Sequence, residues 1–241
     1  MEFTVNSLED FQKGVIIPVN KPYEWTSFDV VKKIKNQVSK KLRQKLNIRL
    51  KNFKVGHAGT LDPLADGLVL VCTGKATKKI NELMLAEKEY IATIMLGKTT
   101  PSFDLETAYD QTYPVDHIHQ EMVQEVLQGF LGEQMQVPPV YSAKNINGKR
   151  AYEFARKGES VEMKSNLITI SAIELLAYDL PNIQFRVVCS KGTYIRSLAR
   201  DIGERLSSGA HLTQLTRTRI GDYHIDSSIT LEEFEKFLVI L

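Results

Sequence analysis

The stretch VGHAGTLDPLADGLVLV, residues 55–71, places three glycines, one histidine and two aspartates ahead of an apolar run. The apolar run, Leu68 to Cys72, predicts a buried strand, and the glycines predict tight turns before it. Aspartates in such loops often only bond to nearby backbone amides. The stretch therefore predicts a loop leading into a strand, and it leaves the role of Asp62 and Asp66 open.

Two common loop sites do not fit this stretch. A phosphate-binding P-loop requires G-x-x-x-x-G-K-[ST], but six residues separate Gly67 from Gly74, and Ala76 stands where the hydroxyl belongs. The spacing of His57, Asp62 and Asp66 matches no familiar metal site. We therefore predict neither a P-loop nor a metal centre here.

The composition is that of a globular protein with a substantial core. The chain has 241 residues, of which 43% are hydrophobic, enough for one large domain or two small ones. Cys72 and Cys189 both lie in apolar, strand-like runs, and the N-terminus shows no secretory pattern, so we expect a reduced, cytoplasmic setting. The apolar runs are far shorter than the roughly 20 residues that span a bilayer, which predicts no membrane helix.

The charge is unevenly distributed although the net charge is only +2. Between Lys32 and Lys54 there are ten Lys or Arg residues and no acid. Such a run is either the solvated face of a helix or a surface that binds phosphates. Because the run leads into the glycine loop, we expect a polyanion and the loop to share one surface.

Hydrophobic periodicity predicts an α+β fold. Strand and helix patterns alternate irregularly and are joined by hairpin-type connections, which argues against a doubly wound sheet. We expect Ser27 to cap a helix, Gly132 to end another, and Thr230 with Glu233 to form a capping box. Strands are expected over residues 14–19, 68–72, 89–97, 167–178 and 183–190, helices over 76–86, 120–132 and 194–206, a loop over 98–118, and a turn at Asn147-Gly148 before a short helix.

A second group of polar residues lies in CSKGTYIRSLARDIGERL, residues 189–206. Tyr194 and Arg196 stand where a strand turns into a helix. Taken alone, Arg196 is expected on the surface in a charge series with Arg200 and Glu204. Alternatively, a catalytic carboxylate in a water-poor pocket needs a cation beside it, and a guanidinium fits that role. Tyr194, like Tyr90 in an earlier strand, is either a packing residue or a platform for a nucleobase.

Together these segments resemble the TruB-type tRNA pseudouridine synthases. The resemblance runs from about Gly14 to the C-terminus. It is carried by GHAGTLDPLADGLV, by Asn20-Lys21-Pro22, by KEYIATIMLGKTT, by VPPVYSAKNINGKRAYEFARKG, by SKGTYIRSLARDIGE and by SGAHLTQLTRTRIG.

The resemblance implies a role for each matching residue. Asp62 corresponds to the family's catalytic nucleophile, Arg196 to the arginine that pairs with it, and Tyr90 to the tyrosine that packs on the target base. Asp66 lies outside the nucleophile position and is interpreted as structural. The residues expected to contact the RNA or border its cleft are His57, Tyr90, Tyr194, Leu215 and Lys21.

The resemblance also implies the fold and the reaction. We expect a pseudouridine synthase catalytic fold, with a mixed, mostly antiparallel sheet, flanking helices and a central RNA-binding cleft, in a single domain over residues 1–241 without the PUA domain of longer members. The implied reaction converts uridine 55 in the T loop of tRNA to pseudouridine. It implies no cofactor, no metal, no membrane and no obligatory protein partner. Attack of Asp62 on the sugar, attack on the uracil ring and a glycal route all remain open.

Two segments of the sequence differ from the pattern of the family. The segment KTTPSFDLET is less acidic than its counterpart in the family, so the place of Asp104 near the site is uncertain from sequence. The basic 32–54 segment looks longer than usual and is a candidate replacement for the missing RNA-binding domain.

The alternative function is a non-catalytic RNA-binding protein or tRNA folding chaperone. A hydrolase using Asp62 with His57 as base is disfavoured because no oxyanion or metal partner is evident.

Overall fold

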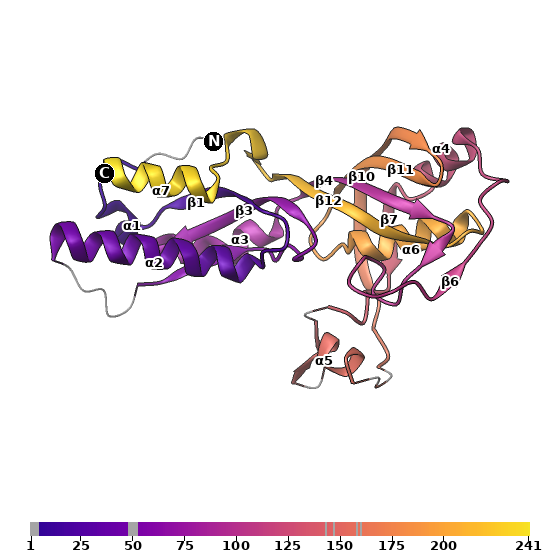
Figure 1. The fold of residues 1–241 in the computed structure, drawn as a ribbon, viewed down its shortest axis with the longest axis horizontal. Helices are drawn as coiled ribbons and strands as arrows, with labels where there is room; N and C mark the ends of the chain where they lie inside the picture. The colour runs from indigo at the N-terminus through magenta and orange to yellow at the C-terminus, as the bar shows by residue number, and fades with distance from the viewer. Residues whose placement is uncertain (1–4, 48–52, 143, 147, 158, 160) are drawn as a thin grey trace. The chain divides into compact units, whose positions relative to one another are not determined.

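The computed structural model describes residues 5–47, 53–142, 144–146, 148–157, 159 and 161–241 (Figure 1). The chain divides into two compact units. Unit 1 is formed by the described residues of Met1–Glu89 together with Thr216–Leu241, and unit 2 by those of Tyr90–Leu215. The expected single domain over residues 1–241, without a PUA domain, remains a prediction.

Strand β3 (Asp66–Thr73) is the centre of unit 1. It pairs antiparallel with β1 (Ile16–Lys21) on one side and with β2 (Val55–Ala58) on the other. Beyond β2 it also pairs with the last part of β12 (Ala210–Ile220), and this pairing is parallel, with Thr216 opposite Asp66. Every residue of β3 after Asp66 is buried, which explains its continuous apolar sequence. The short β13 (Tyr223–His224) pairs with the end of β12.

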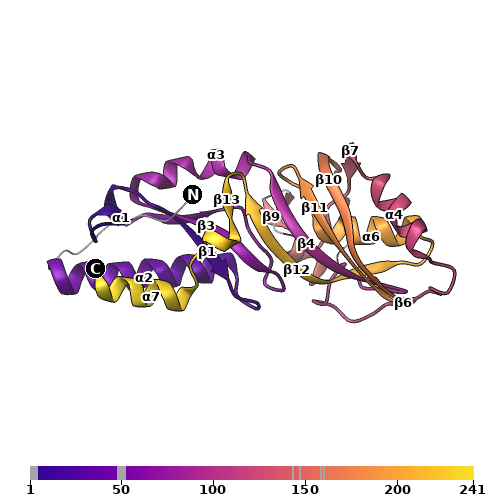
Figure 2. The same cartoon turned by 90° about the horizontal axis from the view of Figure 1, so that it is seen from above.

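Helices cover both faces of the unit 1 sheet, as Figure 2 shows. Helices α2 (Ser27–Leu46) and α7 (Leu231–Ile240) lie on one face, and α3 (Ile80–Leu85) lies on the other after the 3-10 turn η1 (Gly74–Lys79). Side chains alternate along β3, so Leu68 and Leu70 pack with Ile80 and Leu83 of the α3 face. The remaining short elements are α1 (Asp10–Lys13) and η2 (Ile225–Ser227).

Capping residues define the starts of α2 and α7. The expectation that Ser27 caps α2 is wrong, because Thr26 is the N-cap and forms a capping box with Asp29. The side chain of Ser27 is instead bonded to the backbone of Leu61, so the serine serves a tertiary contact. The capping box predicted for Thr230 and Glu233 is confirmed at the start of α7.

In unit 2 the strand order is β12, β4, β11, β10, β7. These strands are β4 (Lys88–Leu96), β7 (Gly132–Gln136), β10 (Asn166–Asp179) and β11 (Asn182–Cys189), and β10 is antiparallel to both β7 and β11. Two small ladders join β5 (Lys98–Thr99) to β6 (Gln111–Thr112) and β8 (Asn145–Ile146) to β9 (Lys149–Arg150). The helices are α4 (Gln120–Gln128), α5 (Ala151–Ala155) and α6 (Ile195–Arg205).

Helix α4 ends earlier than the sequence predicts. The helix expected over residues 120–132 stops at Gln128, and Gly132 begins β7 instead of ending the helix. The cause is a tertiary contact, because Arg205 donates to the carbonyl of Gly129 at 2.9 Å and lies 3.6 Å above the Phe130 ring. In the expected turn at Asn147-Gly148, Asn147 lies outside the described residues, while Gly148 has φ +85° between β8 and β9.

The expected α+β class with a mixed, mostly antiparallel sheet is confirmed. Cys72 and Cys189 are free and buried in β3 and β11, and burial raises the pKa of the Cys72 thiol to about 11. Among the helices of the described residues, none has the length and apolar character needed to cross a membrane.

Packing of α7 against the N-terminal segment gives a stability prediction. Phe234 is fully buried and meets Phe11 edge-on, with ring centroids 6.0 Å apart. We expect Phe234→Ala to lower the free energy of unfolding by about 3–5 kcal/mol, through lost burial and the cavity left behind. Val239→Ala on the exposed side of α7 is the control and should change it by less than about 0.5 kcal/mol. Urea unfolding measures both, and equal effects would contradict the packing of α7 described here.

Candidate functional site

The loop that carries Asp62 connects β2 to β3 in unit 1. A turn begins at Asp62, whose carbonyl accepts from the amide of Ala65 at 3.1 Å. The next residue, Pro63, accepts from the amide of Glu24 at 2.8 Å, and the preceding residue, Leu61, is bonded to the Ser27 hydroxyl through both its amide and its carbonyl. The residues on both sides of Asp62 are thus held by one segment, residues 24–27, which lies far from it in sequence.

Arg217 secures the start of this loop from β12. Its side chain is 1% exposed and donates to the carbonyl of Leu68 at 2.7 Å, of Gly59 at 3.1 Å and of Thr60 at 3.4 Å. The planar guanidinium therefore bridges the loop and the strand that follows it, a task suited to its fixed fork of donors. The sequence-based site did not include Arg217. In the sequence, the signal for Arg217 was a long basic side chain in an expected strand, two positions after Leu215.

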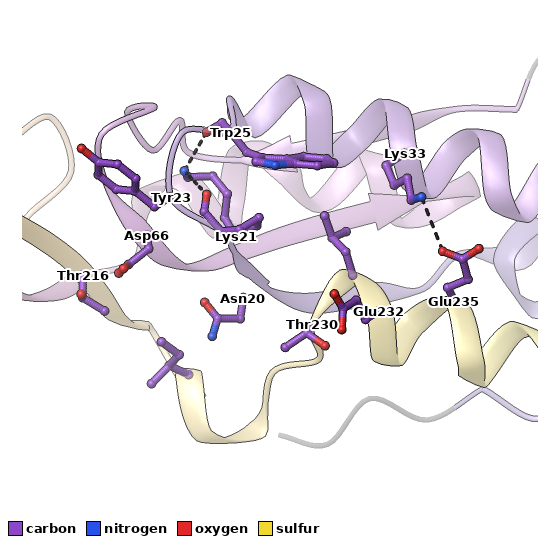
Figure 3. Close-up of a pocket in the computed structure, with 13 residues that line it drawn as sticks. Asn20, Lys21, Tyr23, Trp25, Lys33, Asp66, Thr216, Thr230, Glu232 and Glu235 are labelled. Carbon is purple, nitrogen blue, oxygen red and sulfur yellow. Dashed lines mark hydrogen bonds and ion pairs between the residues drawn. The ribbon is translucent and has the colours of Figure 1, made fainter. Parts of the chain in front are cut away.

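Lys21 secures the other side of the loop from the end of β1. Its side chain is fully buried, and its ammonium group donates to the carbonyls of Trp25 at 2.7 Å and Pro22 at 2.9 Å (Figure 3). It also donates to the carbonyl of Pro63 at 3.5 Å. Burial lowers the pKa of Lys21 from 10.5 to about 8. The Asp66 and Asp62 carboxylates oppose that shift, so both lie within electrostatic reach of Lys21. The loop half of the site thus contains a cation of its own.

His57 lies in β2 and belongs to the same unit. Burial lowers the pKa of its imidazole below the usual 6.5, Arg217 lowers it further, and a backbone hydrogen bond with Gly59 acts in the opposite direction. The ring is therefore neutral at physiological pH. It sits at the strand end from which the loop of Asp62 departs.

A groove of about 830 Å³ lies in unit 1 beside Lys21 and Asp66 (Figure 3). Residues from the end of β1, from α2, from β12 and from the start of α7 line it. One carboxylate oxygen of Asp66 has no hydrogen-bond partner among the described residues, and Figure 3 shows Asp66 next to Thr216. Asp62 is not among the lining residues, so this groove adjoins the loop and does not contain the predicted nucleophile.

The arginine half of the predicted site lies in unit 2, on the first turn of α6. Arg196 is 5% exposed, donates to the carbonyl of Tyr141 at 2.8 Å and to that of Ser102 at 3.4 Å, and pairs with Asp104 at 3.5 Å. The alternative that Arg196 is a surface residue is wrong. Arg200 forms the surface pairs instead, with Asp201 at 2.5 Å and Glu204 at 3.7 Å.

Asp104 is the acidic neighbour of Arg196 that sequence reasoning left aside. It is buried, and its carboxylate also accepts from the amide of Glu106 at 2.9 Å. Phe103 before it has φ +63°, a backbone conformation that the sequence does not announce. Because of Pro101 and this turn, the sequence did not show that Asp104 lies beside Arg196.

The aromatic residues of unit 2 lie at ordered positions. Tyr90 lies on the buried side of β4, on the same face as Ala92, Ile94 and Leu96. Tyr194 is the N-cap residue of α6, and the Gln136 side chain accepts from its amide at 2.8 Å and donates to its carbonyl at 3.1 Å. Leu215 is buried in β12.

The predicted residues thus divide between the units. Asp62, His57 and Lys21 belong to unit 1, whereas Tyr90, Tyr194, Arg196 and Leu215 belong to unit 2. The predicted pairing of Asp62 with Arg196 joins the two units and remains a prediction. Within the described residues, no group of three or more His, Cys, Asp or Glu side chains is arranged to hold a metal ion.

Comparison with known proteins identifies the family. Residues 43–195 match the model of the TruB family pseudouridylate synthase N-terminal domain, and residues 196–241 match that of the tRNA pseudouridylate synthase B C-terminal domain. The chain belongs to the TruB family of pseudouridylate synthases.

Relatives of similar length support this TruB membership. The tRNA pseudouridine synthase B of Parabacteroides distasonis is 57% identical over 229 residues, which are 95% of each chain. That of Flavobacterium johnsoniae is 50% identical over 230 residues, 95% of this chain and 98% of its own. Among solved structures, a chain of a Cbf5–Nop10–Gar1 complex is 29% identical with a TM-score of 0.69, over 96% of this chain and 56% of its own length. The TruB fold predicted from the sequence is therefore confirmed.

The buried fork of Arg217 gives a test of how the loop is held in this TruB family member. Arg217→Lys retains the charge but loses the geometry that reaches three carbonyls. We expect kcat for pseudouridine formation to fall by roughly ten- to a hundred-fold, because displacement of the loop disturbs the predicted site while RNA contacts persist. Arg219→Lys on the same strand is the control and should retain most activity. A higher KM with an unchanged kcat would show that Arg217 does not position the loop.

The lowered pKa of Lys21 gives a second test. Between pH 8 and 10.5 the folded protein binds fewer protons at Lys21 than the unfolded chain does. The contribution of Lys21 to the free energy of unfolding therefore rises with pH across this window. We expect the difference in unfolding free energy, wild type minus Lys21→Met, to increase from pH 8 to 10.5 in urea titrations. A difference that stays constant would show that burial does not depress this pKa.

Proposed function

We propose that this TruB family protein converts uridine 55 in the T loop of tRNA to pseudouridine, with Asp62 as the nucleophile. The observation that carries the proposal is the way the loop is held. Ser27, Lys21 and Arg217 all bond to the backbone within three residues of Asp62. Such rigid support is what a catalytic carboxylate requires and what a simple turn does not. The tRNA substrate is also the one that the names of the relatives state.

The reaction needs no redox partner. The N1–C1′ bond of the uridine breaks, a C5–C1′ bond forms, C5 loses a proton and N1 gains one. The target base must first leave its stack, at a cost of a few kcal/mol that is smaller for a loop nucleotide. An ionised Asp62 serves any of the three routes, whether it attacks C1′, attacks the uracil ring or assists a glycal. Lys21 lies within electrostatic reach of the Asp66 and Asp62 carboxylates and supplies positive charge beside the loop.

The residues of unit 2 complete the proposed site. We assign Arg196 the role of a second cation for Asp62, with Asp104 as the acid that orients its guanidinium. Tyr90 is proposed to pack on the extruded base. Gln136 holds the turn at Tyr194 and so sets where α6 begins. Contacts of Tyr194, His57 and Leu215 with the nucleotide are likewise part of the proposal.

Lys21 is proposed to act mainly through the loop. A fully buried ammonium that donates to three carbonyls positions the backbone around Asp62 and supplies charge there. A direct contact of Lys21 with the substrate remains a prediction. We propose that the protein acts in the cytoplasm, where tRNA is processed. The T stem-loop is the element that it is proposed to recognise, and no obligatory protein partner is proposed.

Replacement of Asp62 tests the proposal. Wild type, Asp62→Asn and Asp66→Asn are incubated with an unmodified T-arm stem-loop, and pseudouridine is detected with carbodiimide. Loss of the nucleophile should reduce the rate by at least about 10⁴-fold, because the other groups act only together with it. Asp66→Asn is the matched control in the same loop and should retain activity. RNA affinity, measured separately, should change little in Asp62→Asn.

Two outcomes would contradict the proposal. Product formed by Asp62→Asn at the wild-type rate would remove Asp62 from the chemistry. RNA binding by the wild type without product on several tRNAs would favour the non-catalytic RNA-binding protein or folding chaperone.

A further inference from the structure

Helix α2 presents a row of basic side chains to solvent. The basic row consists of Lys32, Lys35, Lys40 and Arg43, all of them exposed. The exposed side chains between Lys32 and Arg43 include no apolar residue. The acid of α2, Asp29, lies in its first turn and is engaged by Thr26 in the capping box. Asp29 acts electrostatically on Lys32, and between Lys35 and Arg43 the helix has neither an exposed apolar side chain nor an acid.

On the flank of α2 that faces α7, a basic side chain is paired with an acid. There Lys33 pairs with Glu235 at 3.5 Å (Figure 3). Gln37 donates to the same carboxylate at 2.9 Å. Among the described residues, the four side chains of the basic row form no ion pair within the 4 Å limit for such contacts. Glu235 of α7 thus compensates charge on one flank of α2, where it engages Lys33 and Gln37.

The position of the row relative to Asp62 is set by a contact inside unit 1. Ser27, the first residue of α2, is bonded to Leu61, the residue before Asp62. At about 1.5 Å per residue, the row begins about 8 Å along the helix axis from this contact and extends for about 16 Å. A nucleic-acid duplex carries closely spaced phosphates, so a row of this length faces several of them.

We propose that the basic row binds the phosphate backbone of the RNA duplex that flanks the target loop. This inference rests on the proposed function, because it takes the base at Asp62 as the starting point of the bound RNA. An anionic membrane is a poorer fit, since the row lacks the apolar side chains with which an interfacial helix inserts. Phosphate contacts position a nucleic acid without reading its sequence. The row should therefore affect affinity and leave the chemical step unchanged.

The sequence-based basic segment and the row are not identical. Arg49 and Lys51 of the 32–54 segment lie outside the described residues. Lys41 is only partly exposed, and Lys33 is engaged with Glu235. Lys45 and Lys54 are exposed but lie beyond the row, so Lys32, Lys35, Lys40 and Arg43 are the exposed basic residues between positions 32 and 43 of α2.

Two variants with the same charge change test the row. The first replaces Lys32, Lys35, Lys40 and Arg43 with Gln. The second, a control, replaces Lys13, Lys75, Lys78 and Lys79, which are also exposed in unit 1. Three of these control lysines lie on η1, which follows β3 and precedes α3 on the opposite face of the sheet (Figure 2). RNA binding is measured against salt concentration, using T-arm stem-loops with a short and with an extended stem.

For the first variant we expect affinity for the extended stem to fall by about ten-fold or more and the slope of log K against log salt to fall by about 3. Lengthening the stem should improve binding by the wild type and the control, but not by the first variant. At saturating RNA, kcat should stay within about two-fold of wild type. Equal slopes for the two variants would overturn the inference. Absence of product from the wild type would instead overturn the proposed function, and the binding slopes are read independently of it.

Discussion

The guanidinium of Arg217 is the contact on which the candidate site depends most. Removing a charged group from water costs several kcal/mol, so a guanidinium that is 1% exposed persists only where its donors are satisfied. Here three backbone carbonyls accept from it, two in the loop before Asp62 and one in β3. The parallel pairing of β12 with β3 places the side chain at this point. Loop, strand pairing and buried charge are therefore parts of one arrangement.

The same principle recurs at each buried cation of the site. Lys21 donates to three carbonyls around the loop, and Arg196 combines two carbonyls with the carboxylate of Asp104. The contacts of Lys21 are neutral carbonyls, whereas Arg196 also has the charged partner Asp104. Asp66 and Asp62 both act electrostatically on Lys21.

Helix α2 links the chemistry of the loop to the binding of a large substrate. Its first residue is bonded to the loop, its buried side packs on the sheet, and one flank is neutralised by α7. The remaining exposed side is basic. A helix fixed at its start to the loop of Asp62 gives each of its charges a defined distance from that loop. The proposed RNA-binding row and the proposed nucleophile are thereby connected through one element.

Local patterns were sufficient for much of the fold. The apolar run in β3, the alternation in β4 and the Thr230 capping box were predicted correctly, because each depends on neighbours within a few residues. Two helix ends were predicted wrongly. At the end of α4, Arg205 binds the carbonyl of Gly129, a distant contact, whereas α2 is capped by Thr26 through a local capping box with Asp29.

The motifs of the sequence by themselves determined the family and named Asp62, Tyr90 and Arg196, because catalytic residues lie in long and distinctive segments. Only the tertiary structure decided what supports them. Arg217, Asp104 and the fully buried state of Lys21 became evident when distant strands and loops were brought together. The physical reason is that a residue type can be read locally, whereas burial and the partners of a charge are set by segments far away in the chain.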